Sequence, residues 1–217
     1  MSIGIAVAIG DAVLMVADGR RSNAYEVLTN EAQKIVELAE SRAVIEFGAV
    51  MASTAVVNEL KVSSHMLLNG DDLISSLTRA IQNAGTLLVA SVTPDSTDMS
   101  RIKVGLLAGG VDVDGAYVGG ALYGHGMNEP NAILVRPSPE PEYIVLGGEA
   151  CGAQEYFKIE LERAYRVAAT DQSTFLSMAK RAAKSTVRHA ASRDPTIGGR
   201  VQYCVLQSGK PIQRGFL

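Results

Sequence analysis

Apolar and polar positions follow two different periods along the chain, and the change of period separates blocks of strands from blocks of helices. Short apolar runs fill the first fifty residues, with polar turns between them. They predict strands at residues 3–9, 12–17, 33–38 and 43–47. Gly10-Asp11, between the first two runs, is a strong hairpin signal. Because the runs are almost continuously apolar, we expect a sheet that is covered on both faces.

From Gly48 onward the apolar residues recur at helical spacing. The pattern predicts helices at residues 49–68, from Gly70-Asp71 to about Ser91, near 150–168 and at 171–192. Asp171 is the expected N-cap of the last helix. Further strands are expected at residues 102–108, 131–136, 143–147 and 200–207. The glycine-rich stretch 109–129 is interpreted as an irregular or hairpin excursion, inserted at the mouth of a site or at a subunit interface.

The order of these elements indicates the fold class. Strands, two helices, strands, two helices and a final strand are typical of an α+β protein. Sheets bracketed by helix pairs favour a four-layer αββα sandwich. Internal repeats, low-complexity segments and linkers are not evident, and 217 residues suit one compact unit. We therefore expect a single domain over residues 1–217.

Composition narrows the class of protein. The chain carries 20 basic and 23 acidic residues, a formal net charge of −3, which gives no electrostatic footprint for nucleic acid or an anionic membrane. Cys151 and Cys204 are too few for a disulfide framework or a zinc site. A signal peptide and a run of eighteen apolar residues are both lacking. We expect a soluble, cytoplasmic protein without metal or organic cofactor.

Candidate chemistry begins at Ser2. Removal of Met1 would leave a serine with both a hydroxyl and a free α-amine, whose ordinary pKa of about 8 suits a base near neutral pH. A nearby lysine would lower the pKa of that amine, and a carboxylate would hold the lysine in place. Asp18 ends the second predicted strand and Lys34 opens the third. Gly48 lies where the fourth strand turns into a helix, a suitable place for a backbone N–H that stabilises an oxyanion.

The spacing of these residues and the short sequence motifs around them resemble those of the proteasome β-subunit family. These are N-terminal-nucleophile hydrolases that include the bacterial heat-shock-locus peptidase and the ancestral β-subunit group. Asp18, Lys34 and Gly48 follow Ser2 by 16, 32 and 46 residues. VADGRRS resembles the family's A-D-x-R-x-T/S, QKI its x-K-I/V, and EFGAVMAS its a-G-x-x-A-D helix entry. Toward the C-terminus, RDPTIGG resembles R-D-x-x-S-G-G.

The resemblance implies a fold, an activity and roles for single residues. The fold would be the αββα sandwich of N-terminal-nucleophile hydrolases, and the activity peptide-bond hydrolysis through an acyl-enzyme. Ser2 would be the nucleophile with its own amine as base, while Lys34 tunes the site, Asp18 positions the lysine and the Gly48 N–H stabilises the oxyanion. Asp194 would be a supporting aspartate. In substrate binding, the resemblance makes Arg20 a structural arginine, Ser22 a backbone clamp for bound substrate and Glu46 part of the base of a pocket that favours a basic side chain. The alternative for Glu46 is an ion pair with Lys34 or another neighbour.

The chain also departs from the family. Most members use threonine as the nucleophile, and Gly148 and Ile197 stand where the family has serines. Two alternatives therefore stay open: a non-catalytic assembly subunit, and an amidase or ligase acting on another substrate. The resemblance further implies a homo-oligomer, as a ring or a helical stack, and an ATP-driven unfoldase that delivers unfolded protein.

Overall fold

The computed structural model describes residues 2–22, 26–64, 69–91 and 103–217. Within these ranges the protein is a mixed α+β structure with antiparallel sheets, which confirms the predicted class. The helices are α1 (Val50–Val62), α2 (Gly70–Ser91), α3 (Ala153–Ala168) and α4 (Gln172–Ala191), with a 3-10 turn η4 (Glu149–Cys151) before α3. The strands are β1 (Gly4–Ile9), β2 (Ala12–Ala17), β3 (Arg21–Ser22), β4 (Val27–Thr29), β5 (Ile35–Ala39), β6 (Arg42–Gly48), β7 (Lys103–Asp112), β8 (Gly115–Gly124), β9 (Asn131–Val135), β10 (Glu142–Leu146), β11 (Gln202–Gln207) and β12 (Gln213–Phe216).

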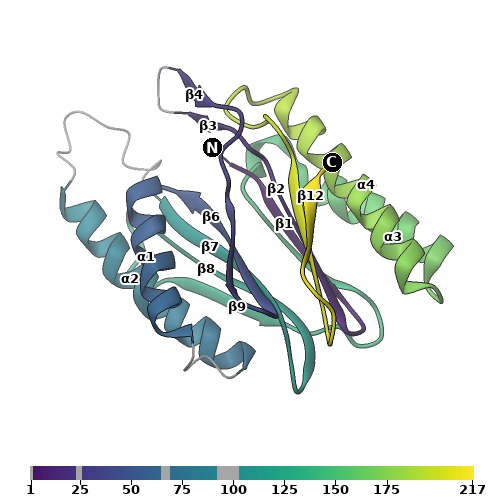
Figure 1. Ribbon diagram of the computed structural model, residues 1–217. Coiled ribbons are helices and arrows are strands. Elements are labelled where there is room, and N and C mark those ends of the chain that lie inside the picture. The colour runs from purple at the N-terminus through teal and green to yellow at the C-terminus, as the bar shows by residue number, and fades with distance from the viewer. Residues whose placement is uncertain (1, 23–25, 65–68, 92–102) are drawn as a thin grey trace.

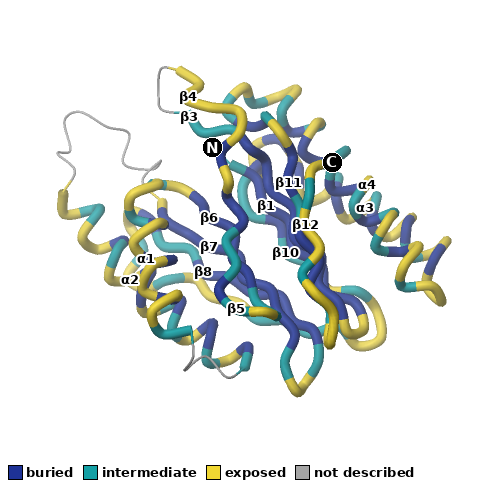
Figure 2. Tube along the Cα trace, viewed as in Figure 1, coloured by how far each residue is buried: buried dark blue, intermediate teal, exposed yellow. Residues whose placement is uncertain are grey.

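Two five-stranded sheets face each other, in the orders β10-β1-β2-β11-β12 and β5-β6-β7-β8-β9. Helices α3 and α4 lie on the outer side of the first sheet, and α1 and α2 on the outer side of the second (Figure 1). A third apolar cluster lies between the sheets. In β1, Ile5 and Val7 belong to the cluster under α3 and α4, whereas Ala6 and Ala8 belong to the cluster between the sheets. Since successive strand residues point to opposite faces, both faces of β1 are covered, as the apolar runs predict (Figure 2).

For residues 109–129 the hairpin alternative is confirmed, but the interpretation as an irregular, inserted excursion is wrong. Strand β7 extends to Asp112, and β8 pairs with it in register to Gly124, so both strands are central in the second sheet. The glycines reflect close packing instead of irregular structure. A Cβ atom on Gly109 would lie 2.8 Å from Val13 Cγ1 of the facing sheet, and one on Gly119 would lie 2.6 Å from Ile74 Cδ1 of α2. Small residues let the sheets and helices approach closely at these points.

Other boundaries differ in smaller ways. Helix α1 ends at Val62, short of the predicted residue 68, and residues 65–68 lie outside the described part of the chain. The short strand pair β3–β4 and the strand β12 were not predicted. β3 and β12 are mostly polar, and β4 contributes only Val27 and Leu28, which are too short an apolar run to indicate a strand. The N-cap prediction is confirmed, since the Asp171 carboxylate accepts hydrogen bonds from the backbone N–H groups of Ser173 and Thr174.

Candidate functional site

Ser2, Asp18 and Lys34 lie together at one end of the two sheets. Lys34 Nζ donates to Ser2 Oγ at 2.9 Å and to Asp18 Oδ1 at 2.7 Å. The hairpin of β1 and β2 explains the approach of the first two residues, because antiparallel pairing sets the end of β2 beside the start of β1. The Ile3 N–H donates to Asp18 Oδ1 at 3.0 Å, and the Asp18 N–H donates to the Ile3 carbonyl at 3.2 Å. Asp18 and Lys34 are buried and Ser2 is half-buried.

Lys34 comes from the other sheet, and Gln202 of β11 helps to hold it there. Gln202 Oε1 accepts from the backbone N–H of Lys34 at 3.1 Å and from that of Ile35 at 3.3 Å, while its Nε2 donates to the Ala32 carbonyl at 2.6 Å. The Glu46 N–H donates to the Lys34 carbonyl at 3.1 Å. Gln202 was not predicted from the sequence. The one signal in the sequence is an amide side chain in a strand that is otherwise largely apolar.

The Asp18 carboxylate has a further donor in the loop before β11. Asp18 Oδ2 accepts from the Gly198 N–H at 3.1 Å, and Gly198 has a φ of +133°, which favours glycine. Three donors therefore fix the orientation of this fully buried carboxylate. Burial lowers the pKa of Lys34, and the charge and hydrogen bond of Asp18 oppose that effect. The lysine thus holds its proton less tightly than a lysine in water.

Ser2, Lys34, Glu46 and Gly48 line a small depression. The other residues that line it are Arg21, Phe47, Val50 and Ser53. Gly48 ends β6 with a φ of +74°, and a Cβ atom there would lie 1.9 Å from the Lys103 carbonyl oxygen. Only glycine fits this strand-to-helix turn, which lies two residues before the start of α1. The partial positive charge of the helix N-terminus favours a developing anion there.

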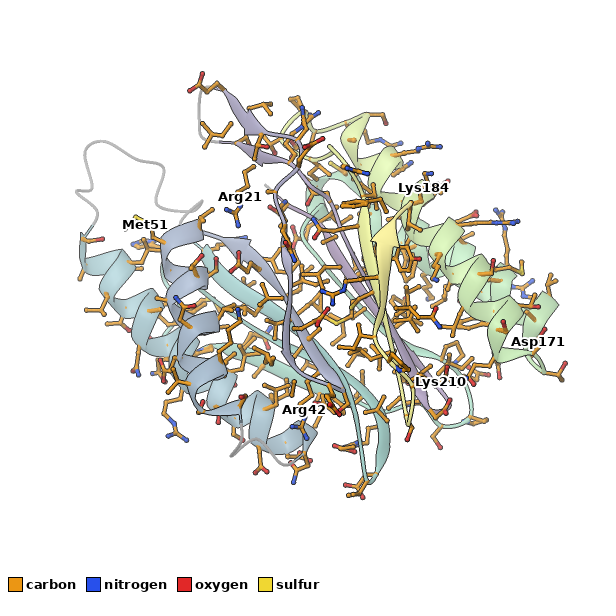
Figure 3. The ribbon with its side chains drawn as sticks, viewed as in Figure 1. Arg21, Arg42, Met51, Asp171, Lys184 and Lys210 are labelled. Carbon is orange, nitrogen blue, oxygen red and sulfur yellow. The ribbon has the colours of Figure 1, made fainter. Side chains whose placement is uncertain are left out.

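Glu46 forms an ion pair with a neighbour, as the alternative prediction had it, and that neighbour is Arg21. Arg21 Nη2 lies 3.0 Å from Glu46 Oε2, and the two side chains are 31% and 8% exposed. Figure 3 shows Arg21 between the β3–β4 hairpin and the end of α1 that carries Met51. Burial raises the pKa of Glu46, and the Arg21 charge opposes the rise. The carboxylate that was expected to favour basic side chains is therefore paired within the protein.

Arg20, Asp194 and Ser22 do not line the depression. Arg20 binds the loop that follows α4: its Nη1 donates to the Pro195 carbonyl at 2.5 Å and to the Ile197 carbonyl at 3.2 Å. Asp194 accepts from the Thr196 N–H at 2.8 Å and from its hydroxyl at 2.6 Å. Both residues shape the loop that presents Gly198 to Asp18. Ser22 lies half-buried in β3, beside Arg21.

The two departures from the family have a structural basis. Gly148 has a φ of +71°, and a Cβ atom there would lie 2.9 Å from Ala153 Cβ, so a serine would be strained. The Ile197 side chain is fully buried in the cluster beneath α3 and α4. The nearest hydroxyl in that loop belongs to Thr196, which bonds Asp194. A hydroxyl therefore remains in the loop, one residue before the position where the family has it.

No family model and no curated protein matches this chain. Among the described residues, no group of three or more histidine, cysteine, aspartate or glutamate side chains is placed to hold a metal ion. None of the helices within the described ranges has the length and apolar character needed to cross a membrane.

Proposed function

We propose that the protein is an N-terminal serine hydrolase of the proteasome β-subunit type, with the sandwich fold of that class, and that it cleaves peptide bonds. The supporting observation is the contact of Lys34 Nζ with both Ser2 Oγ and Asp18 Oδ1. Asp18 and Lys34 follow Ser2 by 16 and 32 positions. The three residues flank the ends of strands from two sheets, and Ser2 and Lys34 line one depression with the Gly48 turn.

The reaction needs the bond before Ser2 to be cleaved, which frees the Ser2 α-amine. The amine then takes the hydroxyl proton as Oγ attacks the substrate carbonyl carbon. The buried Lys34 ammonium stabilises the alkoxide character of Oγ, and the Gly48 N–H donates to the carbonyl oxygen as it becomes an oxyanion. Collapse of the tetrahedral intermediate breaks the C–N bond, and the Ser2 ammonium gives its proton to the leaving amine. Water then hydrolyses the Ser2 ester, with the same amine as base.

Covalent labelling tests this proposal. Intact-mass measurement shows whether the chain begins at Ser2, and a peptide vinyl sulfone or fluorophosphonate should add one equivalent to Ser2. Ser2→Ala should abolish both labelling and cleavage of fluorogenic peptides. Ser208→Ala is the matched control, since Ser208 is exposed in the turn before β12 and should react normally.

The two rival functions give different results. A chain that begins at Ser2 but neither labels nor cleaves any amide would be a non-catalytic subunit. Labelling at Ser2 with turnover of small amides, and none of peptides, would indicate an amidase or ligase. Either result would overturn the peptidase proposal.

We also propose that copies of the chain assemble, as the resemblance implies, into a ring or helical stack served by an ATP-driven unfoldase. Several large apolar side chains on α1 and α2 are exposed in the single chain, among them Met51, Val62 and Leu87. Burying them between copies would remove apolar surface from water. Light scattering after size exclusion should give a mass well above that of one chain, whereas a monomer at all concentrations would contradict assembly.

A further inference from the structure

A second cavity lies apart from the depression that contains Ser2. It has a volume of about 250 Å³ and shares no lining residue with that depression. Its walls come from the second half of α4, the loop 198–201, Arg20 and Leu217. Its apolar floor includes Val187 and Val201, which are buried.

The ionisable side chains that line this cavity are all cationic. They are Arg20, Lys184, Arg188 and Arg200. Within the described residues, none of the four forms an ion pair with a carboxylate. Lys184 and Arg188 stand four residues apart on α4, where like charges repel across one helical turn (Figure 3 labels Lys184). The lining side chains therefore bring positive charge to this cavity, and within the described residues no carboxylate side chain is paired with it.

Two of the guanidinium groups are held in place by neutral partners. Arg20 donates to Asn30 Oδ1 at 2.8 Å and to the carbonyls of Pro195 and Ile197. The Arg200 guanidinium lies 3.7 Å from the centre of the Phe216 ring. These contacts orient the guanidinium groups without an anionic side chain as partner. A ligand would meet cations that have already lost part of their side-chain freedom.

We propose that this cavity binds a small oxyanion of the phosphate class, either inorganic phosphate or the phosphate group of a small molecule. Guanidinium groups present paired N–H donors that match phosphate oxygens. Several positive charges around one cavity favour a dianion over chloride or a monovalent carboxylate. The concave shape suits a small ligand, and the overall charge of the chain offers no extended basic surface for a polynucleotide.

The cavity borders the loop that supports the candidate site. Gly198 lines the cavity, and its N–H donates to Asp18 Oδ2 on the other side of the loop. Phosphate binding itself does not depend on the proposed peptidase activity. Ser2→Ala should bind phosphate like the unaltered protein, because Ser2 lies outside the cavity. A failure of the peptidase proposal can thus be told apart from a failure of this one.

Titration calorimetry with sodium phosphate, at an ionic strength fixed with sodium chloride, tests the proposal. We expect saturable binding of one phosphate per chain, with a roughly millimolar or tighter dissociation constant. Arg188→Gln/Arg200→Gln should weaken binding at least about tenfold, because charge-assisted hydrogen bonds to phosphate are the strong ones. Both side chains are exposed, so the variant should fold. Arg181→Gln is the matched control: it lies exposed on the same helix, outside the cavity, and should bind phosphate normally.

Competitors identify the ligand class. Sulfate should compete with phosphate, and acetate should not. A nucleoside monophosphate that binds more tightly than inorganic phosphate would assign the cavity to a larger phosphate-bearing ligand, within the same proposal. No saturable binding, equal binding of acetate, or an equal loss in Arg181→Gln would overturn it.

Discussion

Replacement of Lys34 by methionine tests whether the buried ion pair organises this end of the molecule. The Lys34 and Asp18 side chains are 3% and 0% exposed, so water cannot replace the lost ammonium. Asp18 would keep two hydrogen bonds, from the N–H groups of Ile3 and Gly198. Removing one partner of a buried pair costs about 3–5 kcal/mol, and the remaining donors place the expected loss near the lower end, at about 3 kcal/mol. For a chain of this size the melting temperature should fall by roughly 6–12 °C.

Urea unfolding at neutral pH measures this loss. Arg163→Met is the matched control, since it breaks a pair with Glu160 whose side chains are 68% and 27% exposed. That control should lose less than about 1 kcal/mol, as exposed pairs do. If Lys34→Met lost as little as the control, the pair would be behaving as a solvated one, and the reasoning would fail.

The unfolding free energies of the unaltered protein and Lys34→Met should also differ in their dependence on pH. Burial lowers the pKa of Lys34 in the folded protein below the ordinary value of 10.5. Between the two pKa values the unfolded chain binds a proton that the folded chain has released, so stability rises with pH in that window. The unfolding free energy of the unaltered protein, measured against Lys34→Met, should therefore increase as the pH rises from the lowered pKa of Lys34 toward 10.5. A difference that stayed flat or fell would contradict the lowered pKa.

Three further predictions concern single side chains. Gln202→Leu leaves the backbone N–H groups of Lys34 and Ile35 without their buried acceptor. It should therefore lower the unfolding free energy by about 1–3 kcal/mol and slow the labelling of Ser2. Unchanged urea unfolding would contradict this prediction. Asp171→Ala removes the N-cap of α4, so thermal unfolding should show a loss of about 1 kcal/mol in the free energy of unfolding. An unchanged melting temperature would mean that the cap does not stabilise the protein. Arg21→Gln frees Glu46, so peptides with a basic side chain before the cut should be cleaved better than by the unaltered protein. This gain should grow at higher pH, because loss of the Arg21 charge raises the Glu46 pKa further and the carboxylate then ionises only as the pH rises. Equal relative cleavage rates in both proteins would refute a role for this pair in specificity.

Much of the fold could be read from the apolar pattern. The β1–β2 hairpin, the four helices and the Asp171 cap follow from residues close together in the sequence, where periodicity and turn chemistry act locally. The interpretation of residues 109–129 as an irregular, inserted excursion failed because glycine is ambiguous in sequence. It marks a loop when the backbone must turn, and it marks a packed strand when another element lies against it, as Ile74 lies against Gly119.

The residues of the candidate site likewise divide into those that could be predicted from the sequence and those that could not. Ser2, Lys34 and Gly48 were predicted from their positions at strand ends and from the family resemblance, and Glu46 from the resemblance alone; all four line one depression. Arg21 was not predicted, because an arginine at the start of a two-residue strand has no local signal that it faces a carboxylate 25 residues later.

The sequence by itself determined the four helices, most of the longer strands, the order of these elements, and which short segments carry polar side chains at strand ends. Only the tertiary structure decided which of those side chains meet. Gln202 reaches the backbone beside Lys34, and Gly198 reaches Asp18, across separations of 168 and 180 residues. The physical reason is that periodicity records the face on which a residue lies, whereas the partner opposite that face depends on how the sheets stack. Stacking is fixed by the volumes of side chains from the whole chain, and no local stretch contains that information.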